Sequence, residues 1–281
     1  MKQSHLRALQ RVYLVLLFSF MYVPIAVMAV FSFNESKSRT IFTGFTFKWY
    51  KSLFHNEMIL SALGLSLVVA LIAAVVATVV GTAAAIGINA MGKRSQAVIN
   101  NISYMPVVNP EIITGVSLML LFVVVKDGIA WANQNLGWTL PENIFGLPTL
   151  LIAHISFCLP YVIFNVSPKL RQLDVRVYEA ALDLGCNPKQ AFFKVVLPEL
   201  APAILSAFLI CLTYSIDDFI ISYFTSGTVQ TLPIAIYSMT RKKVSPEINA
   251  LSTIIFVVIL SIILIINAKD SRQAKKEAVR D

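Results

Sequence analysis

The sequence contains stretches of 21 to 35 residues without a single Asp, Glu, Lys or Arg, and this feature constrains the fold more than any other. A helix of roughly 20 apolar residues crosses the hydrocarbon core of a bilayer, which is about 30 Å thick. A content of 57% hydrophobic and 14% charged residues, with a mean hydropathy of +0.74, does not fit a water-soluble surface. We therefore expect an all-α membrane protein.

The uncharged runs predict six transmembrane helices in a single membrane domain of residues 1–281. The predicted spans are residues 12–33, 58–90, 98–125, 147–168, 201–223 and 248–268. Pro106 and Pro110 should kink or break the third span, because proline has no amide N–H to donate. Gly64, Gly81 and Gly87 in the second span suit close packing against neighbouring helices.

The basic residues predict the orientation of these spans. Six spans put both termini on one side of the membrane, and that side carries 15 of the 23 Lys and Arg residues. Cytoplasmic loops are enriched in Lys and Arg, so both termini are expected in the cytoplasm and the chain in the cell (inner) membrane. The net charge of +8 would suggest nucleic acid for a soluble protein. Here the basic residues flank apolar runs, so lipid and not nucleic acid is the expected partner.

No catalytic, nucleotide or metal site of its own is expected in this chain. The segment from Gly87 to Lys93 matches part of a Walker A pattern, but Arg94 occupies the position of the magnesium-binding Ser or Thr, and an apolar helix precedes it in place of a strand. We interpret it as the end of the second helix, whose cations complement the helix dipole. Cys158, Cys186 and Cys211 lack metal-ligand spacing.

The largest predicted cytoplasmic loop, residues 169–200, carries the most informative motif. One short helix is expected over residues 179–184, followed by a turn at Asn187-Pro188 and a second helix that lasts until Pro198. The motif reads Glu-Ala-Ala, three residues, Gly, nine residues, Val, one residue, Leu-Pro. Six positions match the EAA loop of ABC-transporter importer permeases, which this loop resembles: Glu179, Ala180, Ala181, Gly185, Leu197 and Pro198.

Other segments narrow the resemblance to PotC-type permeases of spermidine/putrescine importers, and together they cover most of the chain. They are Asn34, Gly44-Phe45-Thr46, Lys48-Trp49-Tyr50, residues 154–160, Asp217-Asp218, Leu232-Pro233, residues 236–239 and residues 244–250. Residues 127–143 look longer than expected in such a subunit.

The resemblance implies a type I ABC importer permease fold and a function as half of the translocation pathway of an ATP-driven polyamine importer. It implies a second permease subunit of different sequence, two ATP-binding subunits and an extracellular or periplasmic solute-binding protein as partners. ATP and magnesium would bind to the partner ATPase, and this chain would hold no cofactor. The residue 169–200 loop would insert into the ATPase and transmit its closure to the transmembrane helices.

Three acidic residues interrupt predicted transmembrane helices: Glu111, Asp217 and Asp218. An ionisable group at membrane depth costs several kcal/mol unless it is paired or faces water, which makes it a functional hypothesis. Carboxylates and aromatic rings, here those of Tyr214 and Tyr223, replace the lost hydration of a polyamine's ammonium groups. The alternative places Asp217 and Asp218 at the outer interface. Since adjacent helical residues point about 100° apart, one should face the pathway and the other a neighbouring element.

Two further interpretations stay open at this stage. His154 has no second ligand at helical spacing, so we interpret it as a packing histidine in preference to a proton relay. An importer permease for ferric ion, thiamine or an organic anion is the first rival function, although cargo without positive charge leaves the three acids unexplained. An intramembrane enzyme is the second, and it would need a catalytic pair on facing helices.

Overall fold

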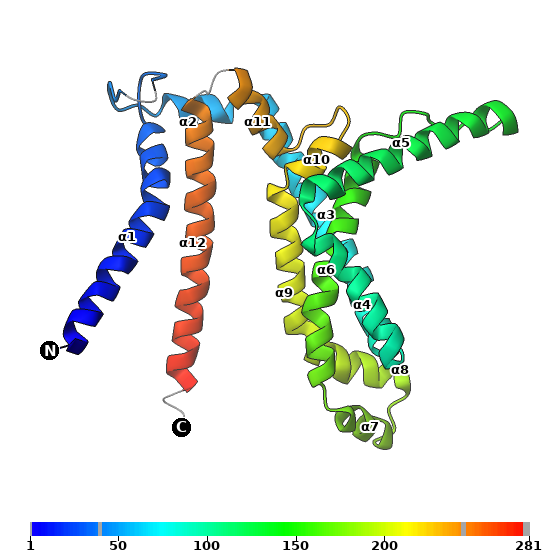
Figure 1. Cartoon of the computed structure of the whole chain (residues 1–281). Coiled ribbons are helices and arrows are strands. Elements are labelled where there is room, and N and C mark those ends of the chain that lie inside the picture. The colour runs from blue at the N-terminus through cyan, green and yellow to red at the C-terminus, as the bar shows by residue number, and fades with distance from the viewer. Residues whose placement is uncertain (1, 39–40, 243–245, 278–281) are drawn as a thin grey trace. The chain divides into compact units, whose positions relative to one another are not determined.

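The structure, a computed structural model, describes residues 2–38, 41–242 and 246–277 (Figure 1). These residues are almost entirely helical, with one isolated β-bridge between Asn34 and Phe45. Five of the described helical segments are long and apolar enough to cross a membrane: Leu9–Phe31, Glu57–Asn89, Glu111–Leu136, Leu147–Gln172 and Pro188–Asp217. The expected all-α membrane architecture is therefore confirmed.

The chain divides into two compact units. The first contains the described residues of Met1–Leu60 and Ile236–Asp281, and the second is Ser61–Ala235. In the first unit α1 (Lys2–Phe31) and α12 (Pro246–Glu277) contact each other and run antiparallel (Figure 1), and α2 (Lys48–Phe54) packs against α12. The sixth predicted span lies in α12, whose side chains after Leu264 are outside the described residues. The count of six spans stays a prediction, and Arg39, Lys243 and Arg280, which entered the charge count, also lie outside the described residues.

A buried asparagine organises the connection between α1 and α2. The Asn34 side chain accepts the N–H of Thr43 at 2.9 Å and donates to the carbonyl of Ile41 at 2.8 Å. The indole N–H of Trp49 donates to the Asn34 carbonyl at 2.7 Å. With the bridge between Asn34 and Phe45, these bonds join three of the segments that carry the resemblance in one folded connection.

The second unit contains most of α3 (Glu57–Asn89) and the start of α11 (Leu232–Lys242). Between them lie α4 (Lys93–Val108), α5 (Glu111–Leu136), α6 (Leu147–Gln172), α7 (Val175–Asp183), α8 (Pro188–Ala191), the π-helical turn η1 (Phe192–Val196), α9 (Leu197–Asp217) and α10 (Ile220–Thr225). The helix α6 packs along α9, and α10 packs against α5 and α6. The core combines small residues of α3 with apolar residues of the other helices: Ala74, Ala77, Ala85, Phe122, Ala153, Phe157, Cys158, Val162, Val166, Ala207, Cys211 and Ile221.

Two predicted spans are each divided by a break. The third, residues 98–125, consists of α4 and α5, because Pro110 lacks an amide N–H and holds Asn109 in an extended conformation with ψ of 140°. The fifth was predicted as one helix over residues 201–223, and this is wrong. The helix α9 ends at Asp217, Asp218 has an extended ψ of 117°, and α10 starts at Ile220.

The interpretation of the basic pair after the second span is also wrong. The helix α3 ends at Asn89, and Gly92 is the N-cap of the next helix, so Lys93 and Arg94 lie in the first turn of α4. Cations at that position do not complement a helix dipole, whose N-terminus is positive. They still flank apolar segments, which is the property that the topology prediction uses.

Of the three glycines expected to allow close packing, only Gly81 has its Cβ position close to another helix among the described residues. A Cβ atom built at Gly81 would lie 2.6 Å from Cβ of Val162, whereas one at Gly64 or Gly87 would meet nothing within 4 Å. The helices α3 and α6 therefore approach each other at Gly81, where a side chain would not fit.

We expect Gly81→Ala to destabilise the second unit by about 1–3 kcal/mol, because the added methyl group overpacks the α3–α6 contact. Gly87→Ala is the matched control on the same helix, and alanine there should be neutral or stabilising by up to about 1 kcal/mol. Thermal unfolding of the detergent-purified protein measures the stability of both variants. Equal melting temperatures for the two variants would contradict the close approach.

Candidate functional sites

The two helix breaks of the second unit bring the three predicted acids near one another. Glu111 is the first residue of α5, Asp217 is the last of α9, and Asp218 lies in the break before α10. The charges of Asp217 and Asp218 both act on Glu111, so the three carboxyl groups share one region. Broken helices at membrane depth expose backbone groups that have no partner within the helix, a recurring feature of substrate and ion sites in transporters.

Glu111 and Asp217 are exposed, and Tyr214 lies three residues before Asp217 on α9, on the same side of the helix. The ring of Tyr214 on α9 lies 4.8 Å from that of Tyr161 on α6, which lies 5.4 Å from the ring of Phe157. Tyr161 in turn interacts electrostatically with Glu111. Carboxylates beside aromatic rings suit an ammonium group. Sequence reasoning missed Tyr161, because it belongs to a helix far from the acids along the chain.

Tyr223, the other predicted aromatic residue, lies beyond the break on α10. It is 49% exposed, and its ring centroid lies 5.4 Å from that of Phe219 and 5.6 Å from that of Phe224. Tyr214 and Tyr223 are therefore placed on different helices, one on each side of the break.

Asp218 differs from Asp217 because it is buried. Its Oδ1 accepts the N–H of Ile221 at 3.2 Å, and its Oδ2 accepts the N–H of Ser222 at 2.7 Å and the Ser222 hydroxyl at 2.9 Å. The carboxylate thus satisfies amide groups that the break leaves without helical partners at the start of α10. The Asp218 side chain therefore bonds within the protein, whereas the Asp217 side chain is exposed.

His154 reaches the same cluster from α6. Its Nδ1 lies 2.6 Å from Oγ of Ser215 on α9, and its Nε2 lies 2.9 Å from Oγ of Ser222 and 3.5 Å from Oδ2 of Asp218. The residue is 1% exposed, and both ring nitrogens have partners, which fits a packing histidine. Sequence reasoning missed Ser215 and Ser222, since a serine in an apolar helix carries no signal by itself.

The residue 169–200 segment folds into an elbow between two helices. Its first helix, α7, ends in a Schellman motif: the N–H of Gly185 donates to the carbonyl of Leu182 at 2.9 Å, and that of Cys186 to the carbonyl of Ala181 at 3.1 Å. Gly185 has a φ of 87°, in the left-handed region where only glycine is free of strain. The left-handed backbone at position 185 therefore explains why the motif has a glycine there.

The second arm of the elbow starts with a capping box. The Asn187 side chain accepts the N–H of Gln190 at 2.8 Å, and the Gln190 side chain accepts the N–H of Asn187 at 3.1 Å. The prediction that this helix ends at Pro198 is wrong, because it continues through η1 into α9. In η1 the N–H of Leu197 donates to the carbonyl of Phe192, five residues back, and this wide turn accommodates a proline that has no N–H to donate.

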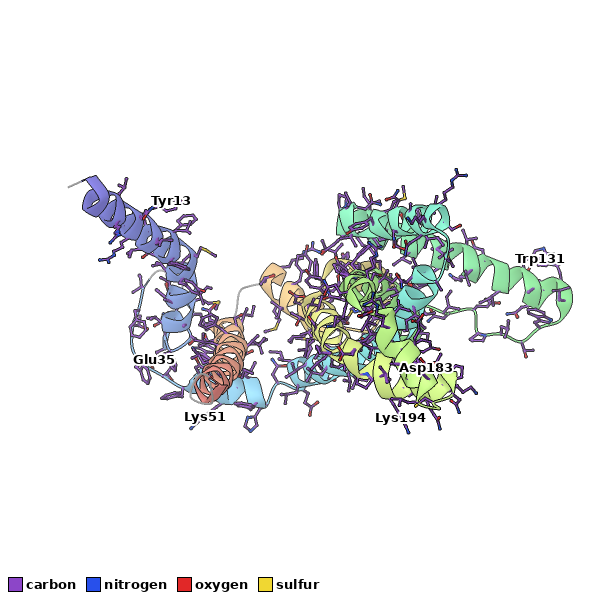
Figure 2. All side chains as sticks on the ribbon, turned by 90° about the horizontal axis from the view of Figure 1, so that it is seen from below. Tyr13, Glu35, Lys51, Trp131, Asp183 and Lys194 are labelled. Carbon is purple, nitrogen blue, oxygen red and sulfur yellow. The ribbon has the colours of Figure 1, made fainter. Side chains whose placement is uncertain are left out.

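The matched motif residues differ in exposure. Glu179, Ala180, Gly185 and Pro198 are exposed, Leu197 is partly buried, and Ala181 is buried. Between them, Leu184 is 87% exposed at the turn of the elbow. Asp183 and Lys194, which belong to the two arms of the elbow, lie close together in the view of Figure 2, and α7 and α8 lie at the same end of the second unit in Figure 1. The elbow therefore presents the apolar side chain of Leu184 among charged residues.

The helix α5 extends beyond the expected end of its span. It continues to Leu136, and its distal part, which carries the exposed Trp131, projects from the rest of the second unit in both figures. The connection that follows is closed by Asn133, whose side chain bonds to the N–H and the carbonyl of Leu140 at 3.0 and 2.9 Å. The segment that looked long in the sequence is therefore an ordered projection.

Comparisons with known proteins identify relatives over almost the whole length. Residues 77–269 match the family described as binding-protein-dependent transport system inner membrane component. The putrescine transport system permease protein PotI of Escherichia coli strain K12 is 38% identical over 274 residues, which cover 96% of this chain and 93% of the relative. The spermidine/putrescine transport system permease protein PotC of the same strain is 34% identical over 261 residues, covering 92% of each chain.

Solved structures share the fold at low sequence identity. A bacterial alginate ABC transporter in complex with an alginate pentasaccharide-bound periplasmic protein matches with a TM-score of 0.71 and 16% identity, over 94% of this chain and 93% of that chain. A bacterial ABC transporter involved in the import of the acidic polysaccharide alginate matches with a TM-score of 0.66 and 13% identity, over 96% and 97%. These structures establish the importer permease fold.

Proposed function

The chain belongs to the family of binding-protein-dependent transport system inner membrane components, and from this membership we propose that it forms half of the translocation pathway of an ATP-driven polyamine importer. The observation that carries the proposal is the identity of 38% and 34% to a putrescine and a spermidine/putrescine permease, in each case over more than nine-tenths of both chains. The protein is a transport subunit and not itself an enzyme.

The chemistry at the helix breaks supports a cationic cargo. Glu111 and Asp217 are exposed carboxylates beside the rings of Tyr214 and Tyr161, and Asp217 lies at the C-terminus of α9, where the helix dipole is negative. These groups together attract an ammonium ion and repel an anion. The alginate transporters show that the same fold also serves an acidic cargo, so the side chains and not the fold must select the cargo.

The elbow supports a set of partner subunits. One chain supplies one elbow, so the proposed importer contains a second permease and two ATP-binding subunits that hold ATP and magnesium. We propose that the second permease has a different sequence. The elbow residues Glu179, Ala180, Ala181, Gly185, Leu197 and Pro198, with the exposed Leu184 among them, would bind the ATPase. A periplasmic protein accompanies the related alginate transporter, which supports a solute-binding protein as the remaining partner.

Uptake by the complete importer tests the proposal. The permease pair, the ATPase and the binding protein are reconstituted in proteoliposomes, and the uptake of labelled putrescine, spermidine and a neutral analogue is measured with ATP inside. We expect saturable uptake of at least one polyamine and none of the neutral analogue. ATP-dependent uptake of an anionic oligosaccharide in place of polyamines would refute the cargo and leave the family membership intact.

The proposed orientation has a separate test by thiol labelling. Cys186 is partly exposed on the elbow, so Cys186→Ser provides the background, while Cys158 and Cys211 are buried. Single cysteines at Lys93 and Asn187 should react with a membrane-impermeant maleimide only after the membrane is opened, and one at Asn135 should react in intact cells. Labelling of position 187 in intact cells would rule out contact between the elbow and a cytoplasmic ATPase.

A further inference from the structure

The buried cluster of His154, Ser215, Asp218 and Ser222 joins three helices at the break between α9 and α10. His154 comes from α6, Ser215 from the last turn of α9, and Asp218 and Ser222 from the other side of Asp217. All four residues are buried, with exposed fractions of 1%, 4%, 8% and 0%. The two ring nitrogens of His154 therefore hold the chain before and after Asp217.

The direction of each hydrogen bond follows from the connectivity. The Asp218 carboxylate only accepts, so the Ser222 hydroxyl donates to it and leaves its own oxygen free to accept from Nε2–H of His154. Nδ1 then carries no proton and accepts the hydroxyl of Ser215. This assignment satisfies each donor and acceptor of the cluster with a neutral imidazole, and replacement of any member leaves a buried polar group without its partner.

The cluster contains the residue types of a hydrolytic triad but not its arrangement. In such a triad one ring nitrogen binds the carboxylate and the other binds an accessible nucleophile. In this protein Ser222 and Asp218 lie on the same ring nitrogen, and the hydroxyl at the other nitrogen belongs to the buried Ser215. No substrate reaches either serine, so the cluster has a role in geometry.

We propose that His154 is a positioning residue for cargo recognition: it fixes the break between α9 and α10 and thereby holds the carboxylate of Asp217 in the orientation that receives an ammonium group. Ser215 lies two residues before Asp217, and Asp218 lies directly after it. The Ser215 hydroxyl contacts Nδ1 of His154, and the Asp218 carboxylate lies beside Nε2 of the same ring, so the chain is held on both sides of Asp217. A freed break would let the last turn of α9 rotate, and Asp217 with it. This inference rests on the proposed function of Asp217 in polyamine transport.

Two substitutions each remove the hydrogen bond between His154 and Ser215, one by changing the histidine and the other by changing the serine. In His154→Gln the side-chain amide takes the place of Nε2 and keeps the contact with Ser222 and Asp218, but loses Ser215. Ser215→Ala removes that bond and leaves the histidine unchanged. In the reconstituted complete importer we expect each variant, and their combination, to raise the KM for putrescine by about tenfold, measured on equal amounts of assembled complex. Ser261→Ala, which removes a hydroxyl that donates to the carbonyl of Val257 within α12, is the matched control.

A double-mutant comparison separates positioning from plain stability. If His154 acts through Asp217, then His154→Gln should not raise the KM further in an Asp217→Asn background. A structural role alone would lower Vmax and the yield of complex with an unchanged KM. Either that result or multiplicative effects of the two substitutions on KM would overturn the proposal.

A second readout keeps the test independent of the cargo. A cysteine in place of Asp217, in the Cys186→Ser background, is labelled with a cationic thiosulfonate in the purified complex, with His154 present or replaced by glutamine. We expect the labelling rate to change several-fold when His154 is replaced. Equal rates would overturn the positioning role, and absence of polyamine uptake by the wild-type importer would refute the proposed function without affecting this measurement.

Discussion

Asp217→Asn is expected to reduce putrescine uptake at limiting concentration by about tenfold or more, while the importer complex assembles at its normal yield. Asp217 is exposed at the C-terminus of α9, beside aromatic rings and near Glu111. Asparagine keeps the volume of the side chain and removes its charge, so the loss reports the attraction of the ammonium group. Initial uptake rates and complex yield are measured on the same preparations.

The neighbouring Asp218→Asn provides the matched comparison. Asp218 is buried and accepts three hydrogen bonds from Ile221 and Ser222, and an amide group offers one oxygen where the carboxylate offers two. The substitution should leave at least one buried donor unpaired, at a cost of about 1–3 kcal/mol, and should lower the yield of the complex. Normal uptake by Asp217→Asn together with defective uptake by fully assembled Asp218→Asn would reverse our assignment of the two acids.

Gly185→Asp is expected to insert into the membrane normally and to lose most ATPase association and transport-linked ATP hydrolysis. The φ of 87° strains most residues with a Cβ atom by about 1–2 kcal/mol, and aspartate and asparagine less than most. Among the described residues, apart from the two chain neighbours, nothing lies within 4 Å of a Cβ atom built at this position. The larger part of the effect should therefore come from the partner that binds the elbow. Co-purification of the ATPase and the rate of ATP hydrolysis measure it.

Two further substitutions at this position separate the two causes. Gly185→Ala introduces the backbone strain with the smallest side chain, so it should have a mild effect. Gly185→Asn tolerates the left-handed conformation but adds bulk, so it should disturb the ATPase contact almost as much as aspartate does. Wild-type ATPase recovery with both Asp and Asn variants would contradict the role of the elbow.

The elbow shows what local sequence signals predict well. A glycine that ends one helix and an asparagine-proline pair that starts the next are short-range signals, and the structure places a Schellman motif and a capping box at these residues. Pro198 misled the prediction, because a proline in the first turns of a helix usually marks its start. Here the wide turn of η1 takes up the missing N–H, and no pattern in the sequence announces a π-turn.

The break after Asp217 shows what local signals do not predict. An apolar segment with two adjacent acids is compatible with a continuous helix, and the partner that stabilises the break, His154, lies more than 60 residues earlier in the chain. The break in the third span was easier to predict, because Pro110 itself interrupts the helix. Gly64 and Gly87 illustrate the same limit, because spacing alone did not distinguish them from Gly81, which faces α6.

The continuity of the helix from Pro188 to Asp217 has a mechanical consequence. These 30 residues are helical without an intervening loop, and Figure 1 shows the short arm around α8 running at an angle to α9. The 21 residues of α9 span about 31 Å at about 1.5 Å per residue, with the arm of the elbow at one end and the carboxylate of Asp217 at the other. A tilt of about 7° around the middle of α9 moves each of its ends by about 2 Å in opposite directions. Such a displacement is enough to break a hydrogen bond, so a small movement of the elbow changes the geometry around Asp217 with no flexible joint between them.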